Sequence, residues 1–211
     1  MKTTSLLIAL MLTLVGCTNM SARSAQDDYS EVYRHAYMAL QKGEWHTYKR
    51  LMRTVIDRST ASDAPPEKRA IYWYEYGRAS GVVCDWEDAE FALTVAHNLD
   101  IKTGGPVHES LNELGRIYVV RKQYEKAVDH FTRAFKALEQ YHEKHPGKEI
   151  TNQLGNARVI EDFAYALEQS GGQQSDVKRL RVSAAEIRKD LNAKDGVYED
   201  VTPYGTQCNS R

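Results

Sequence analysis

The sequence has little of what marks several classes of protein. Its 28 lysines and arginines nearly balance its 29 aspartates and glutamates, which leaves a net charge of −1. Nucleic-acid-binding chains carry a clear basic excess, so this balance argues against that class. Five prolines and thirteen glycines among 211 residues are too few for a collagen-like or mostly disordered chain. This length fits one globular domain that is large enough to bury a core.

The sequence also lacks the short motifs of common enzyme classes. It contains no His-Glu-x-x-His metal motif, no phosphate-binding glycine loop and no Gly-x-Ser-x-Gly nucleophile motif. His142 and His145 are three residues apart, but Pro146 follows at once and ends the helix. We interpret them as solvated polar residues before a turn. The chain is therefore expected to be no enzyme and to have no metal site or cofactor.

The one long apolar run lies near the start of the chain. Lys2 precedes residues 6–15, of which only Thr13 is polar. Ten helical residues rise about 15 Å, which is too short for a hydrocarbon core of about 30 Å, so the run has the form of a signal peptide. It ends in Leu14-Val15-Gly16-Cys17. This ending resembles the signal of bacterial lipoproteins, although a secreted protein with a chance cysteine near its cleavage site is the alternative.

The resemblance to lipoproteins implies where in the cell the protein is located. In that family the cysteine thiol receives a diacylglycerol and the chain is cut just before it, so Cys17 is the expected lipidation site. Each buried methylene contributes about 0.8 kcal/mol, so two or three acyl chains anchor a protein to a bilayer. Thr18 follows the cysteine. In Gram-negative lipoproteins a residue other than aspartate there implies sorting to the outer membrane, facing the periplasm. Residues 1–16 are then the signal peptide, and the small polar residues 17–28 a flexible tether.

Lipidation of Cys17 leaves two further cysteines, Cys84 and Cys208. Disulfides persist in exported proteins, and a remainder of two is what one bridge requires. Such a bridge ties the C-terminal end of the chain to its middle and contributes up to about 4.7 kcal/mol. Two unpaired thiols, or a bond to another chain, are the alternatives.

Residues 29–192 have a helical pattern throughout, with apolar residues recurring at spacings of three and four. One segment fits a known sequence pattern for a pair of packed helices, and a second segment fits the same pattern well. The first consists of Leu111, Leu114, Gly115, Tyr118, Tyr124, Ala127, Phe131 and Ala134. The second consists of Trp73, Tyr76, Gly77, Ser80, Trp86, Ala89, Leu93 and Ala96. The pattern resembles the tetratricopeptide repeat (TPR).

The resemblance implies an all-α fold, a right-handed solenoid of about four helix pairs, in which small residues such as Gly77 and Gly115 stand where two helices cross. The outer pairs, around Ala36 and Ala164, match less well. The repeats are longer than the usual 34 residues. Extra residues fall between pairs at 59–67, 103–106 and 143–148, which resembles kinesin-light-chain-like repeats.

The last residues, 193–211, change character. Lys194-Asp195-Gly196 ends the last helix. Val197, Tyr198, Val201 and Tyr204 make the segment too apolar for a purely disordered tail. We predict an extended tail that packs back on the solenoid and is held by Cys208.

In TPR proteins the first helix of each pair lines a concave groove that binds partner proteins. Tyrosine and arginine anchor interfaces, and a pair of arginines suits a carboxylate. Carried onto this chain, the groove positions are Tyr33, Tyr37, Tyr74, Arg78, Asn112, Arg116, Glu161 and Tyr165. The alternative is that the groove is filled by the chain's own tail.

We therefore predict a lipid-anchored protein of the bacterial cell envelope that acts as a TPR adaptor or assembly factor for a pilus, secretion or wall-building machine. Its partner is expected to be a protein, and no nucleic acid or small-molecule substrate is expected. A periplasmic ligand-binding or sensory lipoprotein, with its groove closed by the tail, is the alternative function.

Overall fold

The computed structural model describes residues 29–146, 153–192 and 201–208. The predicted signal peptide, the tether and Cys17 lie outside these residues. The described part is all-helical, which confirms the predicted fold class. Its helices span residues 29–41, α2 (Trp45–Ala61), α3 (Pro66–Val82), α4 (Trp86–Thr103), α5 (Val107–Val120), α6 (Tyr124–Lys144), α7 (Gln153–Gln169) and α8 (Gln174–Asn192).

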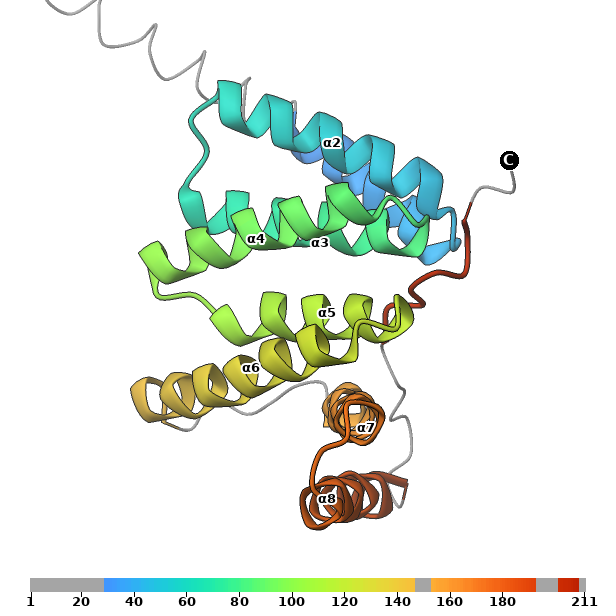
Figure 1. Ribbon diagram of the computed structural model, residues 1–211. Helices are drawn as coiled ribbons and strands as arrows, with labels where there is room; N and C mark the ends of the chain where they lie inside the picture. Colours follow the sequence, from blue (N-terminus) through green and yellow to red (C-terminus); the bar gives the residue numbers. More distant parts are fainter. Residues whose placement is uncertain (1–28, 147–152, 193–200, 209–211) are drawn as a thin grey trace, which may run out of the picture.

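The helices form four pairs that stack along the molecule (Figure 1). Helix 29–41 pairs with α2, α3 with α4, α5 with α6, and α7 with α8. The first helices of neighbouring pairs also touch, because α5 contacts both α3 and α7. In the described part, α4 and α6 make no comparable contact with each other. The first helices therefore lie on the inner side of the stack, and we call the surface that they line the inner face.

Two glycines allow the helices of a pair to cross closely, as predicted. A Cβ atom at Gly77 would lie 2.7 Å from Leu93 Cγ of α4, and one at Gly115 would lie 2.7 Å from Phe131 Cε1 of α6. These distances are shorter than non-bonded carbons tolerate, so only glycine fits. The sequence pattern thus located these crossings correctly.

The aromatic residues of the repeat pattern fill the space between helices. Phe131 and Trp45 are buried in the core, while Trp86 is half-buried against it. Tyr48 fits the family pattern poorly because of its size and polarity, yet it is fully buried. Its hydroxyl donates a hydrogen bond to Glu75 Oε2 at 2.8 Å, which satisfies the polar atom inside the core.

The four turns within the pairs share one backbone feature. Each contains a residue with positive φ: Gly43 at 69°, Cys84 at 66°, Lys122 at 57° and Gly171 at 79°. This left-handed conformation favours glycine, which has no Cβ. Cys84 therefore stands at a position where two of the other turns use glycine.

The second linker between pairs lies at its predicted position, after Thr103 and before Val107. The third begins later than the expected 143–148, because α6 continues to Lys144, and residues 147 and 148 lie outside the described residues. The first is shorter than the expected 59–67, because α2 continues to Ala61. Ser59 is buried, and its hydroxyl donates a hydrogen bond to the carbonyl of Ile56 at 3.1 Å, which satisfies this polar group within the helix.

Candidate functional site

A ladder of alternating charges runs along the inner face. Two of its ion pairs lie within a sequence that occurs twice, as Glu75-Tyr76-Gly77-Arg78 and as Glu113-Leu114-Gly115-Arg116. Since glutamate and arginine are three residues apart on a helix, they lie on one side and pair. Arg78 Nη1 lies 3.2 Å from Glu75 Oε1, and Arg116 Nη1 lies 3.1 Å from Glu113 Oε2.

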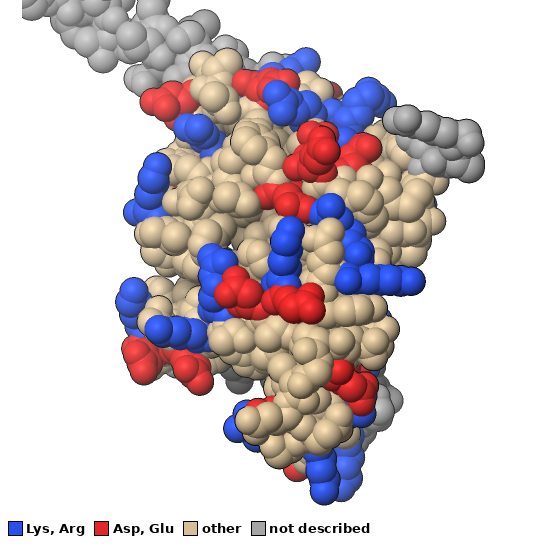
Figure 2. All heavy atoms as spheres, viewed as in Figure 1, with Lys and Arg blue, Asp and Glu red and all other residues tan. Residues whose placement is uncertain are grey.

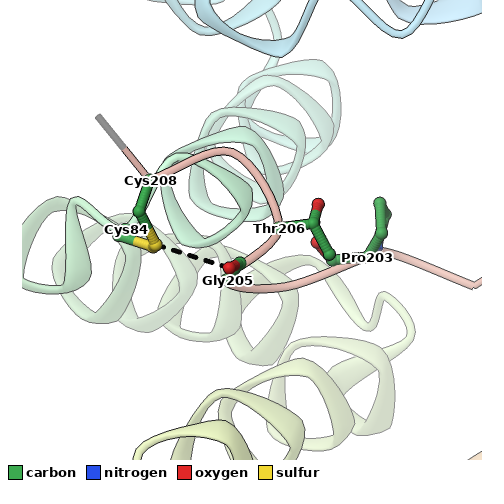
Figure 3. Close-up of a disulfide and its surroundings, with 5 residues drawn as sticks. All are labelled: Cys84, Pro203, Gly205, Thr206 and Cys208. Atoms are coloured by element: carbon green, nitrogen blue, oxygen red, sulfur yellow. Dashed lines mark hydrogen bonds between the residues drawn. A yellow bond between two sulfur atoms is a disulfide. The ribbon is translucent and has the colours of Figure 1, made fainter. Parts of the chain in front are cut away.

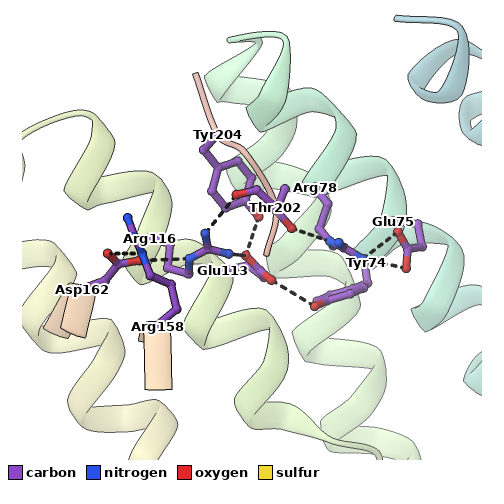
Figure 4. A network of polar contacts seen from close by, with 9 residues as sticks. All are labelled: Tyr74, Glu75, Arg78, Glu113, Arg116, Arg158, Asp162, Thr202 and Tyr204. Carbon is purple, nitrogen blue, oxygen red and sulfur yellow. Dashed lines mark hydrogen bonds and ion pairs between the residues drawn. The ribbon is translucent and has the colours of Figure 1, made fainter. Parts of the chain in front are cut away.

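The ladder continues between helix pairs (Figure 4). Tyr74 of α3 donates to Glu113 Oε1 of α5 at 3.2 Å. Arg116 Nε of α5 lies 3.1 Å from Asp162 Oδ2 of α7, and Arg158 Nε lies 3.1 Å from the other oxygen of that carboxylate. We refer to Glu75, Arg78, Glu113, Arg116, Asp162 and Arg158 as the ladder.

The central arginines of the ladder are buried. The side chains of Arg78 and Arg116 are only 13% and 9% exposed. Burial lowers the pKa of each guanidinium, but the neighbouring carboxylates and tyrosine hydroxyls outweigh burial and hold the pKa above its usual value. Burial raises the pKa of Asp162, although Arg116 and Arg158 oppose this. Buried charges of this kind are stable only while they remain paired.

The C-terminal tail lies directly on the ladder (Figure 4). Arg78 Nε donates to Thr202 Oγ1 at 2.7 Å, and Arg116 Nη2 donates to the carbonyl of Thr202 at 2.9 Å. Tyr204 donates its hydroxyl hydrogen to Glu113 Oε2 at 2.7 Å. Thr202 and Tyr204 are both buried. The tail thus supplies partners to three ladder residues.

The ring of Tyr204 fits against the end of α3. A Cβ atom at Gly81 would lie 2.6 Å from two carbons of the ring. Arg116 Cζ lies 5.3 Å from the ring centroid, which is cation–π distance. The backbone N–H groups of Gly205 and Gln207 donate to the carbonyls of Gly81 and Val82. We call Arg78, Gly81, Glu113 and Arg116 the tail site.

A disulfide joins Cys84 to Cys208, and the two Cα atoms are 5.0 Å apart (Figure 3). Cys84 lies in the turn between α3 and α4. Gln207, the residue before Cys208, donates a hydrogen bond from Nε2 to the carbonyl of Gly43 at 3.1 Å. The tail is therefore held both on the ladder and at the turns of the first two pairs.

Comparisons with known proteins bear on the fold. The structure is similar to that of BtubC (BKLC) from P. vanneervenii, with a TM-score of 0.64 and 15% identity over 87% of this chain and 80% of that one. It is also similar to a kinesin light chain with nearly identical TPR-like repeats from Podosopora anserina, in two structures with TM-scores of 0.57 and 0.53. Both of these are 18% identical over 79% of this chain and 77% of theirs.

The chain has a TPR-type fold. No family model matches the sequence, and no curated protein matches it. The predicted TPR architecture is therefore confirmed by structure and not by sequence relatives.

The TPR-type fold brings three predicted groove residues together at the tail site. Tyr74, Arg78 and Arg116 all belong to the network that surrounds Thr202 and Tyr204. What they hold in this structure is the chain's own tail, as the alternative prediction proposed.

The groove residues of the first helix lie beyond the tail site. The ring of Tyr33 packs on Tyr72 of α3, with centroids 5.3 Å apart. Burial and then Glu75 raise the pKa of Tyr33. Tyr37 is 50% exposed.

The predicted groove residue of α5 beside the ladder is Asn112. Its Oδ1 atom is buried and has no hydrogen-bond partner in the part of the chain that the structure describes.

The fourth pair departs from the predicted groove. Glu161 Oε1 lies 2.6 Å from Nε of Arg188 on α8. The next residue, Asp162, forms the ion pair with Arg116 in its place. One residue turns a helix by about 100°, so a shift of one position changes the side chain that faces the ladder. Tyr165 is 42% exposed and packs edge-to-face on Tyr124 of α6.

Sequence reasoning missed the acidic half of the ladder. The recurrence of Glu-x-Gly-Arg around both crossing glycines was the signal for Glu75 and Glu113. It also missed Gly81, a second glycine near the end of α3 that the repeat pattern does not require. Close approach of another segment is the usual reason for such a glycine.

Two further properties concern metals and membranes. Within residues 29–146, 153–192 and 201–208, no three His, Cys, Asp or Glu side chains gather in a way that could hold a metal ion. Among the described helices, none has the length and apolar character needed to cross a membrane. Acidic and basic side chains are interspersed on the face drawn in Figure 2.

Proposed function

We propose that this chain is a lipid-anchored adaptor of the bacterial cell envelope, which binds a protein partner on its inner face. The observation that carries this proposal is the exposure of large apolar side chains there, outside the tail site. Tyr37 of the first helix is 50% exposed and stands four residues after Tyr33, which packs on α3. Ile71 of α3 is 52% exposed and stands four and seven residues before Glu75 and Arg78, which places it on the same side of the helix as the ladder. Aromatic and aliphatic side chains exposed on a binding face are typical of interfaces.

The proposed location in the cell envelope rests on the N-terminal sequence. Lys2, the apolar residues 6–15 and Leu14-Val15-Gly16-Cys17 together support lipidation of Cys17. Thr18 supports the outer membrane as the destination. The Cys84–Cys208 disulfide is consistent with export, because disulfides persist in oxidising compartments. A pilus, secretion or wall-building machine is the kind of assembly that such an adaptor serves.

One observation favours a second candidate function. Thr202 and Tyr204 occupy the tail site and use the groove arginines. A periplasmic ligand-binding or sensory lipoprotein, with its groove closed by the tail, fits this occupancy. The adaptor function requires that the partner bind the uncovered part of the inner face or take the place of the tail.

The experiment is to purify the protein from its native membrane, measure its intact mass and identify what co-purifies. We expect a mass with acylated Cys17 and one disulfide, together with one envelope complex. Tyr37→Ala combined with Ile71→Ala is expected to lose that complex.

The control truncates two exposed apolar side chains on the second helices of the pairs. Ile101 of α4 is 58% exposed and Val182 of α8 is 48% exposed, close to the values for Tyr37 and Ile71. Ile101→Ala combined with Val182→Ala is expected to retain the complex. Retention by both double variants, or loss by both, would reject the inner face as the binding surface.

A further inference from the structure

We propose that the C-terminal tail is a redox-controlled clamp between two helix pairs. While the Cys84–Cys208 disulfide is intact, the tail holds the second pair (α3 and α4) against the third (α5 and α6) on the inner side of the stack. Reduction of the disulfide by a dithiol frees the tail and lets the two pairs swing apart about their outer contact. The inference goes beyond the adaptor function, because it concerns the shape of the chain and holds whatever the inner face binds.

The outer contact between the two pairs does not involve the tail. Helix α4 packs along α5. Glu90 of α4 accepts a hydrogen bond from the hydroxyl of Tyr118 of α5 at 2.9 Å. It also pairs with Arg121, the C-cap residue of α5. These contacts stay in place when the tail leaves, so they form the hinge about which the pairs turn.

The inner contact between the two pairs depends largely on the tail (Figure 4). Among the described residues, one side-chain hydrogen bond joins α3 directly to α5, from Tyr74 to Glu113. Thr202 of the tail adds two more links, because its hydroxyl accepts from Arg78 of α3 and its carbonyl accepts from Arg116 of α5. The two arginines belong to different pairs, so a single tail residue bridges them.

Tyr204 makes a second bridge between the same pairs. Its hydroxyl donates to Glu113 of α5 at 2.7 Å, whereas its ring lies against Gly81 of α3. The ring is buried and belongs to the hydrophobic core. The N–H group of Gly205 donates to the carbonyl of Gly81 at 3.2 Å. The tail is therefore anchored on the second pair and reaches across to the third.

The disulfide decides whether the clamp stays closed. Fixing the backbone of residues 201–208 costs conformational entropy at each position, and hydrogen bonds that replace bonds to water offset only part of that cost. The disulfide lowers the cost, because it keeps Cys208 beside Cys84 even when the other tail contacts break. Once the bond is reduced, this entropy favours release of the tail.

The disulfide is open to a reductant (Figure 3). Cys208 is exposed and Cys84 is partly exposed, and exposed disulfides are more readily reduced than buried ones. A thiolate of the dithiol attacks Sγ of Cys208 and expels the thiolate of Cys84, which takes up a proton. The second thiol of the reductant then displaces the Sγ of Cys208. The protein gains two electrons and two protons as two thiols, and the dithiol becomes a disulfide.

The test measures a distance across the junction between the pairs. Nitroxide-labelled p-acetylphenylalanine, which needs no cysteine, replaces Ile71 of α3 and Tyr165 of α7, which are 52% and 42% exposed. Double electron–electron resonance compares the oxidised full chain with the same chain in dithiothreitol. We expect a narrow distance distribution in the oxidised chain and, after reduction, a longer mean distance with a distribution at least about twofold wider.

Two controls isolate the clamp. Labels at Ile71 and Glu87, which both belong to the second pair, should give the same distribution before and after reduction. In the oxidised chain, Tyr204→Ala should widen the distribution across the junction, whereas Thr206→Ala, at an exposed tail position, should leave it unchanged. Identical distributions in the oxidised and reduced chains would overturn the proposal, and so would equal effects of the two tail substitutions.

A second measurement applies if the labels or substitutions disturb the fold. The unlabelled wild-type chain is digested with chymotrypsin under native conditions, with and without dithiothreitol. Reduction is expected to speed cleavage after Tyr204 by at least about tenfold, before any cleavage at Phe131, which is buried in the third pair. An unchanged rate after Tyr204 would overturn the proposal. Simultaneous cleavage at both residues would also overturn it, because the disulfide would then hold the whole fold and not the tail.

Discussion

The ring of Tyr204 occupies the space that a side chain at Gly81 would fill: an added Cβ would lie 2.6 Å from the ring. These two residues join the end of the chain to the last turn of α3. The contact depends on the absence of one methyl group, so it can be tested by adding that group.

Gly81→Ala is expected to lower the free energy of unfolding by about 1–3 kcal/mol, because the new methyl group displaces the Tyr204 ring from its site. Urea denaturation measures this change. The control is Ser80→Ala, next to it in α3. Ser80 is fully buried and its hydroxyl has no hydrogen-bond partner in the described part of the chain, so its loss is expected to be neutral or slightly stabilising. A similar loss in both variants would contradict the role given to Gly81.

The disulfide is expected to stabilise the fold by limiting the freedom of the unfolded chain. Cys208→Ser should lower the free energy of unfolding by about 2–4 kcal/mol. Cys84 has a φ of 66°, which costs a residue with a Cβ about 1–2 kcal/mol. A chain with Cys84→Gly and Cys208→Ser should therefore be more stable than one with Cys84→Ser and Cys208→Ser. The opposite order of melting temperatures would show that the turn does not strain residue 84.

Arg116→Met is expected to cost about 3–5 kcal/mol, because it leaves the carboxylates of Glu113 and Asp162 without their central partner. Chemical denaturation measures the loss. Arg133→Met removes an arginine that pairs with Asp129 in an exposed position and should change stability by no more than about 0.5 kcal/mol. Equal effects of the two substitutions would indicate that the ladder contributes no more than a surface ion pair.

Two buried histidines are expected to destabilise the fold in mild acid. Burial lowers the pKa of His130, with help from Arg133, and that of His108, with help from His142, each from 6.5 to about 4. Between pH 6.5 and 4 the unfolded chain binds protons at these positions that the folded chain does not. The free energy of unfolding therefore decreases as the pH falls through this range, by up to about 1.4 kcal/mol per pH unit for each histidine.

Asp100 and Glu109 act in the opposite direction. Burial raises the pKa of Asp100 from 3.8 to about 6, and burial followed by the charge of Asp100 raises that of Glu109 from 4.5 to about 7. The contribution of each carboxyl group to stability therefore decreases as the pH rises between its two values. The histidine contribution is isolated by comparing melting temperatures at pH 7 and pH 5. A double variant with His108→Gln and His130→Gln should lose less stability on acidification than the wild type, whereas His46→Gln, at an exposed site, should behave like the wild type. An unchanged acid response in the double variant would contradict the histidine assignment.

The sequence contained enough information to predict the helix pairs but not the path of the tail. The apolar spacing from Leu111 to Ala134, with Gly115 at the crossing, specifies both helices of a pair, because packing of this kind is local and periodic. The contact of Thr202 with Arg78 joins two segments 124 residues apart, and no periodicity encodes such a pairing. The pattern also placed Glu161 on the inner face, whereas Asp162, one position further along α7, pairs with Arg116 there.

The central claim is that the inner face binds a protein partner, and site-specific crosslinking in native membranes tests it most directly. A benzophenone amino acid replaces Tyr37, which is 50% exposed on the first helix at a predicted groove position, or Ile101, which is 58% exposed on α4. Irradiation is predicted to give one discrete covalent adduct from position 37 and none from position 101. No adduct from position 37, or the same adducts from both positions, would contradict the account.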